Sequence, residues 1–187
     1  GHRKQVLWGG AACLVVGLAV ALYVWRSLAV EVSASDALSR LEVQAALPGG
    51  ARTESAEAYL KVANEHAGTG AGERALLQAG AVLFTHGKYA EAQTQFQKFF
   101  RDYPESSLRG QALLGNAACL DVLAKPDEAA TAYKSVFEQR PGETAATQAK
   151  FALARIYESQ GKLDQARTLY EEVARSDFGS YTEEQFL

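Results

Sequence analysis

Apolar residues in the second half of the chain follow a helical spacing that repeats every 37 residues. Each repeat contains a small residue, a lysine, an alanine and an aromatic residue, in that order. The three copies are Gly87, Lys88, Ala92 and Phe96, then Ala124, Lys125, Ala129 and Tyr133, then Gly161, Lys162, Ala166 and Tyr170. A fixed period of this length is typical of proteins built from stacked structural repeats.

Each repeat is predicted to be a pair of helices joined at the small residue. A left-handed or tight turn is needed there, and a Cβ atom is unfavourable in it. The alanine and the aromatic residue are four positions apart, so they share one face of the second helix, where the alanine lets the first helix approach. Because proline cannot continue a helix, Pro104 and Pro141 are expected to close two units, with Phe178 at that place in the third.

The first helix of each pair repeats in the same register. A large, a small and again a large residue recur at spacings of four and three, which predicts close packing on the partner helix. The columns are Leu76, Leu113 and Lys150; Gly80, Ala117 and Ala154; and Leu83, Leu120 and Tyr157. Lys150 stands where the other two units have leucine.

The N-terminal part has another pattern, because the 20 residues from Val6 to Trp25 carry no charge. This length can cross a bilayer as a helix, and Trp25 lies at its end as interfacial aromatic residues do. Arg3 and Lys4 precede it and Arg26 alone follows, which predicts a cytoplasmic N-terminus and repeats on the outer side of the membrane. A signal peptide is the alternative, but its apolar region would span only about 7–15 residues.

Small residues occupy every fourth position of this apolar segment. They are Gly9, Cys13, Gly17 and Ala21. Such a stripe allows close contact with another helix in lipid. The alternative is that small residues are simply frequent in membrane helices.

Between the apolar segment and the repeats, a helix is expected to continue from Ser27 to Leu47 and to end at the following proline and glycines. Thr53 is expected to cap a further helix. Tyr59 precedes Phe96 by 37 residues, which indicates a degenerate first repeat. We therefore divide the chain into an anchor (1–27), a connecting helix with the degenerate repeat (28–72), and three repeats with a tail (73–187), where Ser180 or Thr182 is expected to cap a final helix.

Composition and charge narrow the function. All 22 acidic residues lie at or after Glu31 with 16 basic residues, so this part has a formal charge of −6 and does not suit nucleic acid. Cys13 lies in the apolar segment and Cys119 in a repeat helix, so we expect neither a disulfide framework nor a metal site. No catalytic motif is present, so we expect no enzyme activity, no cofactor and no small-molecule substrate. The chain has no methionine, so we expect a segment before Gly1.

The remaining candidate is a surface formed by the first helices, which line the concave face of stacked helix pairs. Leu77, Leu114 and Phe151 recur at 37-residue spacing, and such an apolar row with polar flanks suits peptide segments. The polar and apolar residues predicted beside this row are Arg74, Phe84, Gln111, Asp121, Gln148, Arg155 and Glu158. The alternative is that these side chains pack against neighbouring helices.

The columns of small and aromatic residues from about residue 73 to residue 178 resemble the tetratricopeptide repeat, with a period three residues longer than the usual 34. The order of parts also resembles the YfgM-like family of membrane-anchored tetratricopeptide proteins. The segments that carry this resemblance are YVWRS and AEAYLKVANEHAGTGAGERALLQAGAVLFTHGKYAEA. The resemblance implies an all-α protein of the bacterial inner membrane, with a single membrane helix, a cytoplasmic N-terminus and a periplasmic solenoid.

The same resemblance implies partners and a role. They are the Sec translocon, a periplasmic chaperone and unfolded exported proteins, and the role is the handling of newly exported chains. The segment FFRDYPESSLRGQALLG is similar to the Tol–Pal coordinator and to lipoprotein scaffolds of outer-membrane assembly. We therefore predict a membrane-anchored protein-interaction module, with a structural scaffold of a cell-envelope complex as the alternative.

Overall fold

The computed structural model describes the backbone of residues 2–46, 56–139 and 144–184, and side chains at 17–22, 24–43, 56–139 and 144–175. All regular structure in this part is helical, which confirms the predicted all-α class. The helices are α1 (His2–Ala46), α2 (Ala56–Glu65), α3 (Gly70–Thr85), α4 (Tyr89–Asp102), α5 (Arg109–Val122), α6 (Pro126–Gln139), α7 (Thr144–Ser159) and α8 (Leu163–Glu184).

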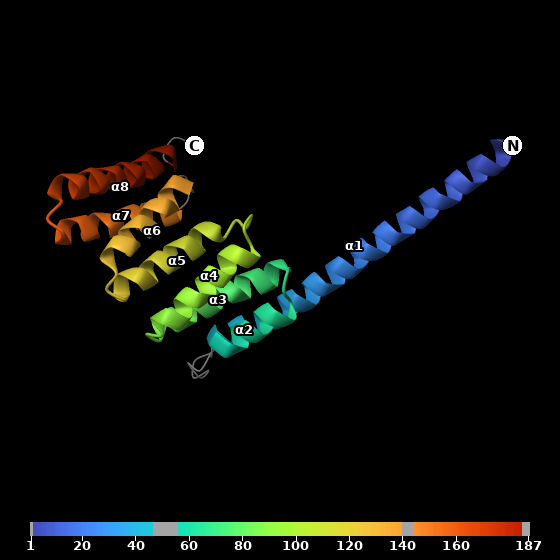
Figure 1. Ribbon diagram of the computed structural model, residues 1–187, viewed down its shortest axis with the longest axis horizontal. Coiled ribbons are helices and arrows are strands. Elements are labelled where there is room, and N and C mark those ends of the chain that lie inside the picture. Colours follow the sequence, from blue (N-terminus) through green and yellow to red (C-terminus); the bar gives the residue numbers. More distant parts are fainter. Residues whose placement is uncertain (1, 47–55, 140–143, 185–187) are drawn as a thin grey trace.

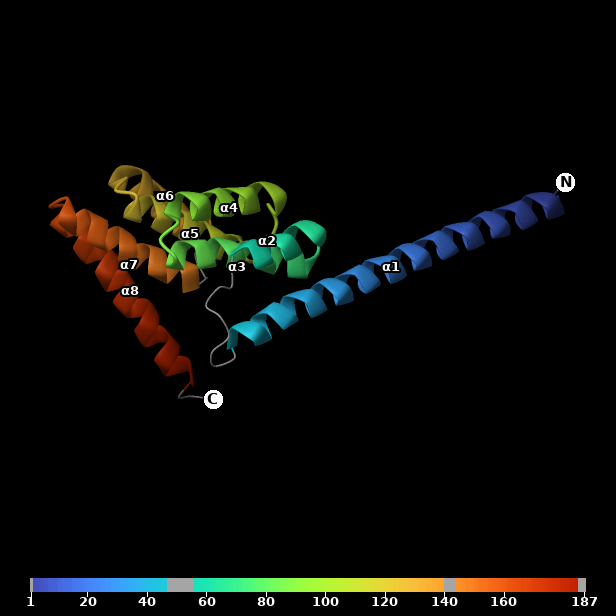
Figure 2. The same ribbon diagram turned by 90° about the horizontal axis from the view of Figure 1, so that it is seen from below.

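Helices α2 to α8 form a solenoid in which each helix packs on the next one along the chain. Helix α5 also contacts both α3 and α7, so these three helices form one layer, while α4 and α6 lie on the other side (Figure 2). Helix α1 packs on α2 and α3 by its last part and extends far from the solenoid by its N-terminal part (Figure 1). The solenoid of helix pairs is the one that the 37-residue pattern predicts.

The predicted turns are present at the small residues. Helices α4, α6 and α8 begin 37 residues apart, each after a residue with positive φ: Gly87 (76°), Ala124 (58°) and Gly161 (72°). The N–H of the next residue bonds the carbonyl five positions back, as Lys88 does to Leu83 at 2.9 Å. This is the Schellman arrangement, which satisfies carbonyls left free at a helix end.

The repeated aromatic residues are core residues where another helix covers them. Phe96 and Tyr133 are each 4% exposed. A Cβ atom at Gly80 would lie 2.7 Å from the Phe96 ring, and one at Gly115 would lie 2.5 Å from it. Both distances are shorter than a real contact, so the ring of α4 lies directly between the backbones of α3 and α5.

The last repeat differs because no described helix follows α8. Tyr170 is only half-buried, and its hydroxyl donates to a Glu158 carboxylate oxygen at 3.0 Å. Lys150, which replaces leucine in the first-helix column, pairs with Glu172 of α8 at 2.7 Å and lies over the ring of Phe137. An ion pair thus replaces an apolar contact between α7 and α8.

Helix α1 is attached to the solenoid by side chains from its last third. Ala34 and Leu38 are 0% and 2% exposed and belong to the same core cluster as Phe96. The Glu31 carboxylate accepts the backbone N–H groups of Gly70 and Ala71, at 3.0 and 3.2 Å. These two groups are free donors at the start of α3, so Glu31 acts as a cap supplied by another helix.

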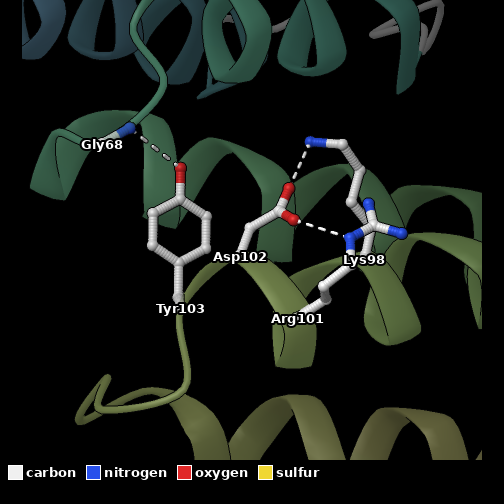
Figure 3. A network of polar contacts seen from close by, with 5 residues as sticks. All are labelled: Gly68, Lys98, Arg101, Asp102 and Tyr103. Atoms are coloured by element: carbon white, nitrogen blue, oxygen red, sulfur yellow. Dashed lines mark hydrogen bonds and ion pairs between the residues drawn. The ribbon is translucent and has the colours of Figure 1, made fainter.

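A second set of polar contacts joins the turn between α2 and α3 to the end of α4 (Figure 3). The Tyr103 hydroxyl accepts the N–H of Gly68 at 3.3 Å. Asp102 pairs with Lys98 at 3.0 Å and with Arg101 at 2.9 Å. The hydrogen bond from Lys98 is the main reason why the pKa of Asp102 is lower than usual.

The C-terminal end of the chain differs from the sequence predictions. Helix α8 continues to Glu184, so Phe178 does not end it and no separate helix begins at Ser180 or Thr182; this stretch contains no proline that would remove a helical hydrogen bond. At the start of α3, Gly70 and Gly72 belong to the helix and Thr69 is its cap. The expected ends at Pro48, Thr53 and Pro141 lie outside the described residues.

The left-handed turns predict opposite effects for two substitutions. Ala124→Gly should raise the free energy of unfolding by about 0.5–1 kcal/mol, because it relieves a Cβ contact in the left-handed region. Gly87→Ala should lower it by about 1 kcal/mol for the same reason. Urea unfolding of the chain in mild detergent, followed by circular dichroism, measures both. Equal stability of both variants and the parent would contradict the turn geometry.

The cap that α1 provides predicts a cost for removing its carboxylate. Glu31→Ala should lower the free energy of unfolding by about 0.5–1 kcal/mol, a modest value because the side chain is half-exposed. Glu42→Ala removes an exposed carboxylate from the same helix and should change it by less than about 0.5 kcal/mol. The same urea titration compares the two. If both substitutions have the same effect, Glu31 does not hold α1 on α3.

Candidate peptide-binding groove

A groove with a volume of about 820 Å³ lies along the layer formed by α3, α5 and the start of α7. Its lining comes from four helices, α3, α4, α5 and α7, and from the turn before α5, so only the stacked fold creates it. The lining residues are Leu77, Gln78, Ala81, Phe84, Thr85, Phe96, Ser107, Gln111, Leu114, Gly115, Ala118, Thr144, Ala145 and Gln148. We call this surface the groove.

No charged side chain is among these lining residues. Leu77, Phe84 and Leu114 provide the larger apolar surfaces. Gln111 of α5 and Gln148 of α7 stand 37 residues apart, so they occupy the same position in the first helices of successive repeats. A glutamine amide can both donate and accept, so it can bond the backbone of a bound segment in either direction. The groove therefore suits uncharged segments whose backbone hydrogen bonds need partners.

The apolar residues of the groove also pack against the interior. Leu77 and Phe84 are half-buried against one core cluster, and Leu114 against the next. The Phe84 ring meets the Tyr89 ring edge to face, with centroids 5.1 Å apart. These side chains therefore contact neighbouring helices and also line the groove, and peptide binding by them stays a prediction.

The structure brings together only some of the predicted site residues. Leu77, Phe84 and Leu114 line the groove, together with both glutamines. Phe151 does not, since α7 lines the groove with its first turns, and the Phe151 ring instead packs on Tyr170 of α8 with centroids 5.6 Å apart. The four predicted charged residues outside the lining are Arg74, Asp121, Arg155 and Glu158.

Several groove residues were missed by the sequence analysis. Ala81 and Ala118 stand 37 residues apart, so the repeat itself could have identified them. Gly115 stands 37 residues after Gln78, and Ser107 stands 37 residues before Thr144, so the period also relates these lining residues. The contact of Gly115 with the Phe96 ring, in contrast, is visible only in the structure.

Two titratable side chains in the core, Cys119 and Tyr133, are buried as packing residues. Burial raises the pKa of the Cys119 thiol to about 11. Burial, with a smaller contribution from Asp121, raises the pKa of Tyr133 to about 12. Both groups are therefore neutral near pH 7. Within the described ranges, no three His, Cys, Asp or Glu side chains are placed to hold a metal ion.

Helix α1 is the one described helix that is long and apolar enough to cross a membrane, by a segment within Gly17–Val43. Gly17 and Ala21 are exposed, and no atom lies within 4 Å of a Cβ built at Gly17. Gly9 and Cys13 lie in α1, but their side chains are outside the described set. The small-residue stripe as a helix-packing surface stays a prediction.

Two tetratricopeptide-repeat family models match the chain, over residues 74–106 and 123–182. The chain thus contains tetratricopeptide repeats, and with the fold above it is a tetratricopeptide-like solenoid. A comparison with curated protein sequences gives no match.

Solved structures of similar fold include three from different proteins. The tetratricopeptide domain of Arabidopsis FLU is 20% identical, with a TM-score of 0.50 over 57% of this chain and 95% of that one. A MamA crystal structure is 17% identical, with a TM-score of 0.51 over 68% and 81%. Repeats of a putative kinesin light chain from Podosopora anserina are 16% identical, with a TM-score of 0.56 over 72% and 70%. At these identities the similarity shows the fold alone.

Proposed function

We propose that this chain is a membrane-anchored protein-interaction module whose groove binds uncharged, apolar segments of other proteins. The observation that carries the proposal is the groove itself, which is about 820 Å³ in volume and has no charged side chain in its lining. Tetratricopeptide solenoids generally serve as protein-interaction scaffolds. This favours another protein, rather than a small-molecule substrate, as the ligand of the groove.

The lining also indicates how tightly such segments bind. Burial of apolar surface contributes about 25 cal/mol per Å² removed from water, but ordering a flexible chain offsets much of this gain. An open groove with three larger apolar side chains therefore supports weak and broad binding. Since the lining carries no charge, affinity should change little with salt.

The proposed setting is the periplasmic face of a bacterial inner membrane. Helix α1 would be the anchor, through residues 6–25, and exported chains that are still unfolded would be the clients. The Sec translocon and a periplasmic chaperone are the proposed partners, which the resemblance to the YfgM-like family supports. Gly9, Cys13, Gly17 and Ala21 would allow lateral contact with a translocon helix in lipid.

A substitution that fills the groove tests this function. Ala118→Trp places a large side chain in the lining without removing any core side chain, so the fold should survive. Binding of a reduced, alkylated protein that cannot refold should weaken by about tenfold or more, which corresponds to 1.4 kcal/mol. Ala90→Trp, on the exposed face of α4, is the matched control and should bind like the parent.

Fluorescence anisotropy with the labelled unfolded protein measures both variants, after circular dichroism has shown equal helicity. Unchanged affinity of Ala118→Trp would exclude the groove as the binding surface. Crosslinking in membranes with a photoreactive residue at Gln111 then distinguishes the two roles: many exported proteins are expected for a chaperone-like module. One folded partner at fixed stoichiometry would instead favour a structural scaffold.

A further inference from the structure

Apolar side chains remain exposed on α1 beyond the predicted membrane segment. Leu28, Val30 and Val32 are 61%, 41% and 63% exposed, although the uncharged segment ends at Trp25. Arg26 is the one charged residue between Lys4 and Glu31. A long arginine side chain at the end of a span can reach the headgroup layer while its stem stays in apolar surroundings.

These three side chains lie on opposite sides of the helix. Successive residues of an α-helix are about 100° apart, so Val30 points away from the side shared by Leu28 and Val32. A protein partner would cover one side of a helix, whereas lipid can cover opposite sides at the same depth. No other part of the described chain covers these residues, so lipid is the partner that fits their arrangement.

The solenoid begins immediately after this segment. Glu31 bonds the first N–H groups of α3, and Ala34 and Leu38 are buried against the solenoid. Glu31 is six residues after Trp25, which is about 9 Å along a helix. The headgroup layer on each side of a bilayer is about 5–10 Å thick. The attachment point of the solenoid therefore falls at the outer boundary of this layer.

Two turns of the solenoid face back along α1 toward its N-terminus, as both views show (Figures 1 and 2). One is the turn between α2 and α3, at residues 66–69, and the other is the turn between α4 and α5, at residues 103–108. The bond between the Gly68 N–H and the Tyr103 hydroxyl joins them (Figure 3). We call residues 66–69 and 103–108 the proximal edge.

We propose that the proximal edge rests on lipid headgroups and that Leu28 and Val30 lie in the interfacial layer of the bilayer, with Val32 at its outer boundary. The proposal depends on the membrane anchorage in the proposed function, and it adds where the bilayer surface lies relative to the solenoid. Because the last part of α1 packs on α2 and α3, the groove is held at a constant height above the membrane.

Site-specific fluorescence on the full chain in liposomes of phosphatidylethanolamine and phosphatidylglycerol tests this placement. In a Cys13→Ser, Cys119→Ala background, single cysteines at Leu28, Ala67, Glu105 and Lys125 carry an environment-sensitive dye. Ala67 and Glu105 are exposed residues on or next to the proximal edge, and Lys125 is the matched exposed control in a turn on the opposite side. Circular dichroism and flotation with the liposomes establish that each variant is folded and anchored.

A lipid with a nitroxide on its headgroup should quench the dyes at Leu28, Ala67 and Glu105 but not at Lys125. Iodide in the water should quench these three dyes several-fold less than the dye at Lys125. If the lipid quenches the dye at Leu28 but the dyes at Ala67 and Glu105 behave like the dye at Lys125, membrane anchorage is supported and the contact of the proximal edge with lipid is wrong. If Leu28 matches Lys125 in a chain that floats, the interfacial placement is wrong. Failure to float would overturn the anchorage and this placement together.

Discussion

The contact of the Phe96 ring with two glycines determines how the stack is built. The ring occupies the space that Cβ atoms would take at Gly80 of α3 and at Gly115 of α5, which would lie 2.7 and 2.5 Å from it. Because protein interiors are closely packed, this contact sets the separation of three helices at once. Phe96 also lines the groove, together with Leu77 and Leu114, so the same contact helps to determine the shape of the groove.

The contact connects the groove to the membrane helix. Phe96 shares a core cluster with Tyr59 of α2 and with Ala34 and Leu38 of α1. Glu31 adds a polar attachment at the start of α3, so the layer that carries the groove is joined to α1 by buried and polar contacts. At the other end, Tyr170 occupies the same position in α8 but no described helix follows it, and its ring packs on Phe151 instead.

The repeat pattern was sufficient to predict the helix pairs, the left-handed turns and the burial of Phe96 and Tyr133, because these depend on local spacing within one repeat. The groove was predicted only in part. Leu77 and Leu114 follow from the pattern, but Phe151 was assigned by the same spacing and lies elsewhere, since α7 meets the groove with its first turns. The roles of Gly115 and Glu31 depend on contacts between helices far apart in the sequence, which spacing does not reveal.

A double-mutant cycle between Gly115 and Phe96 measures the packing on which the stack depends. Without a steric conflict, glycine to alanine inside a helix is stabilising by about 1 kcal/mol. With the Phe96 ring present, we expect Gly115→Ala to be destabilising by about 1–3 kcal/mol, and in a Phe96→Leu background we expect it to be neutral or stabilising. A Gly115→Ala effect that is stabilising in the parent, or equal in both backgrounds, would contradict the placement of the ring between α3 and α5.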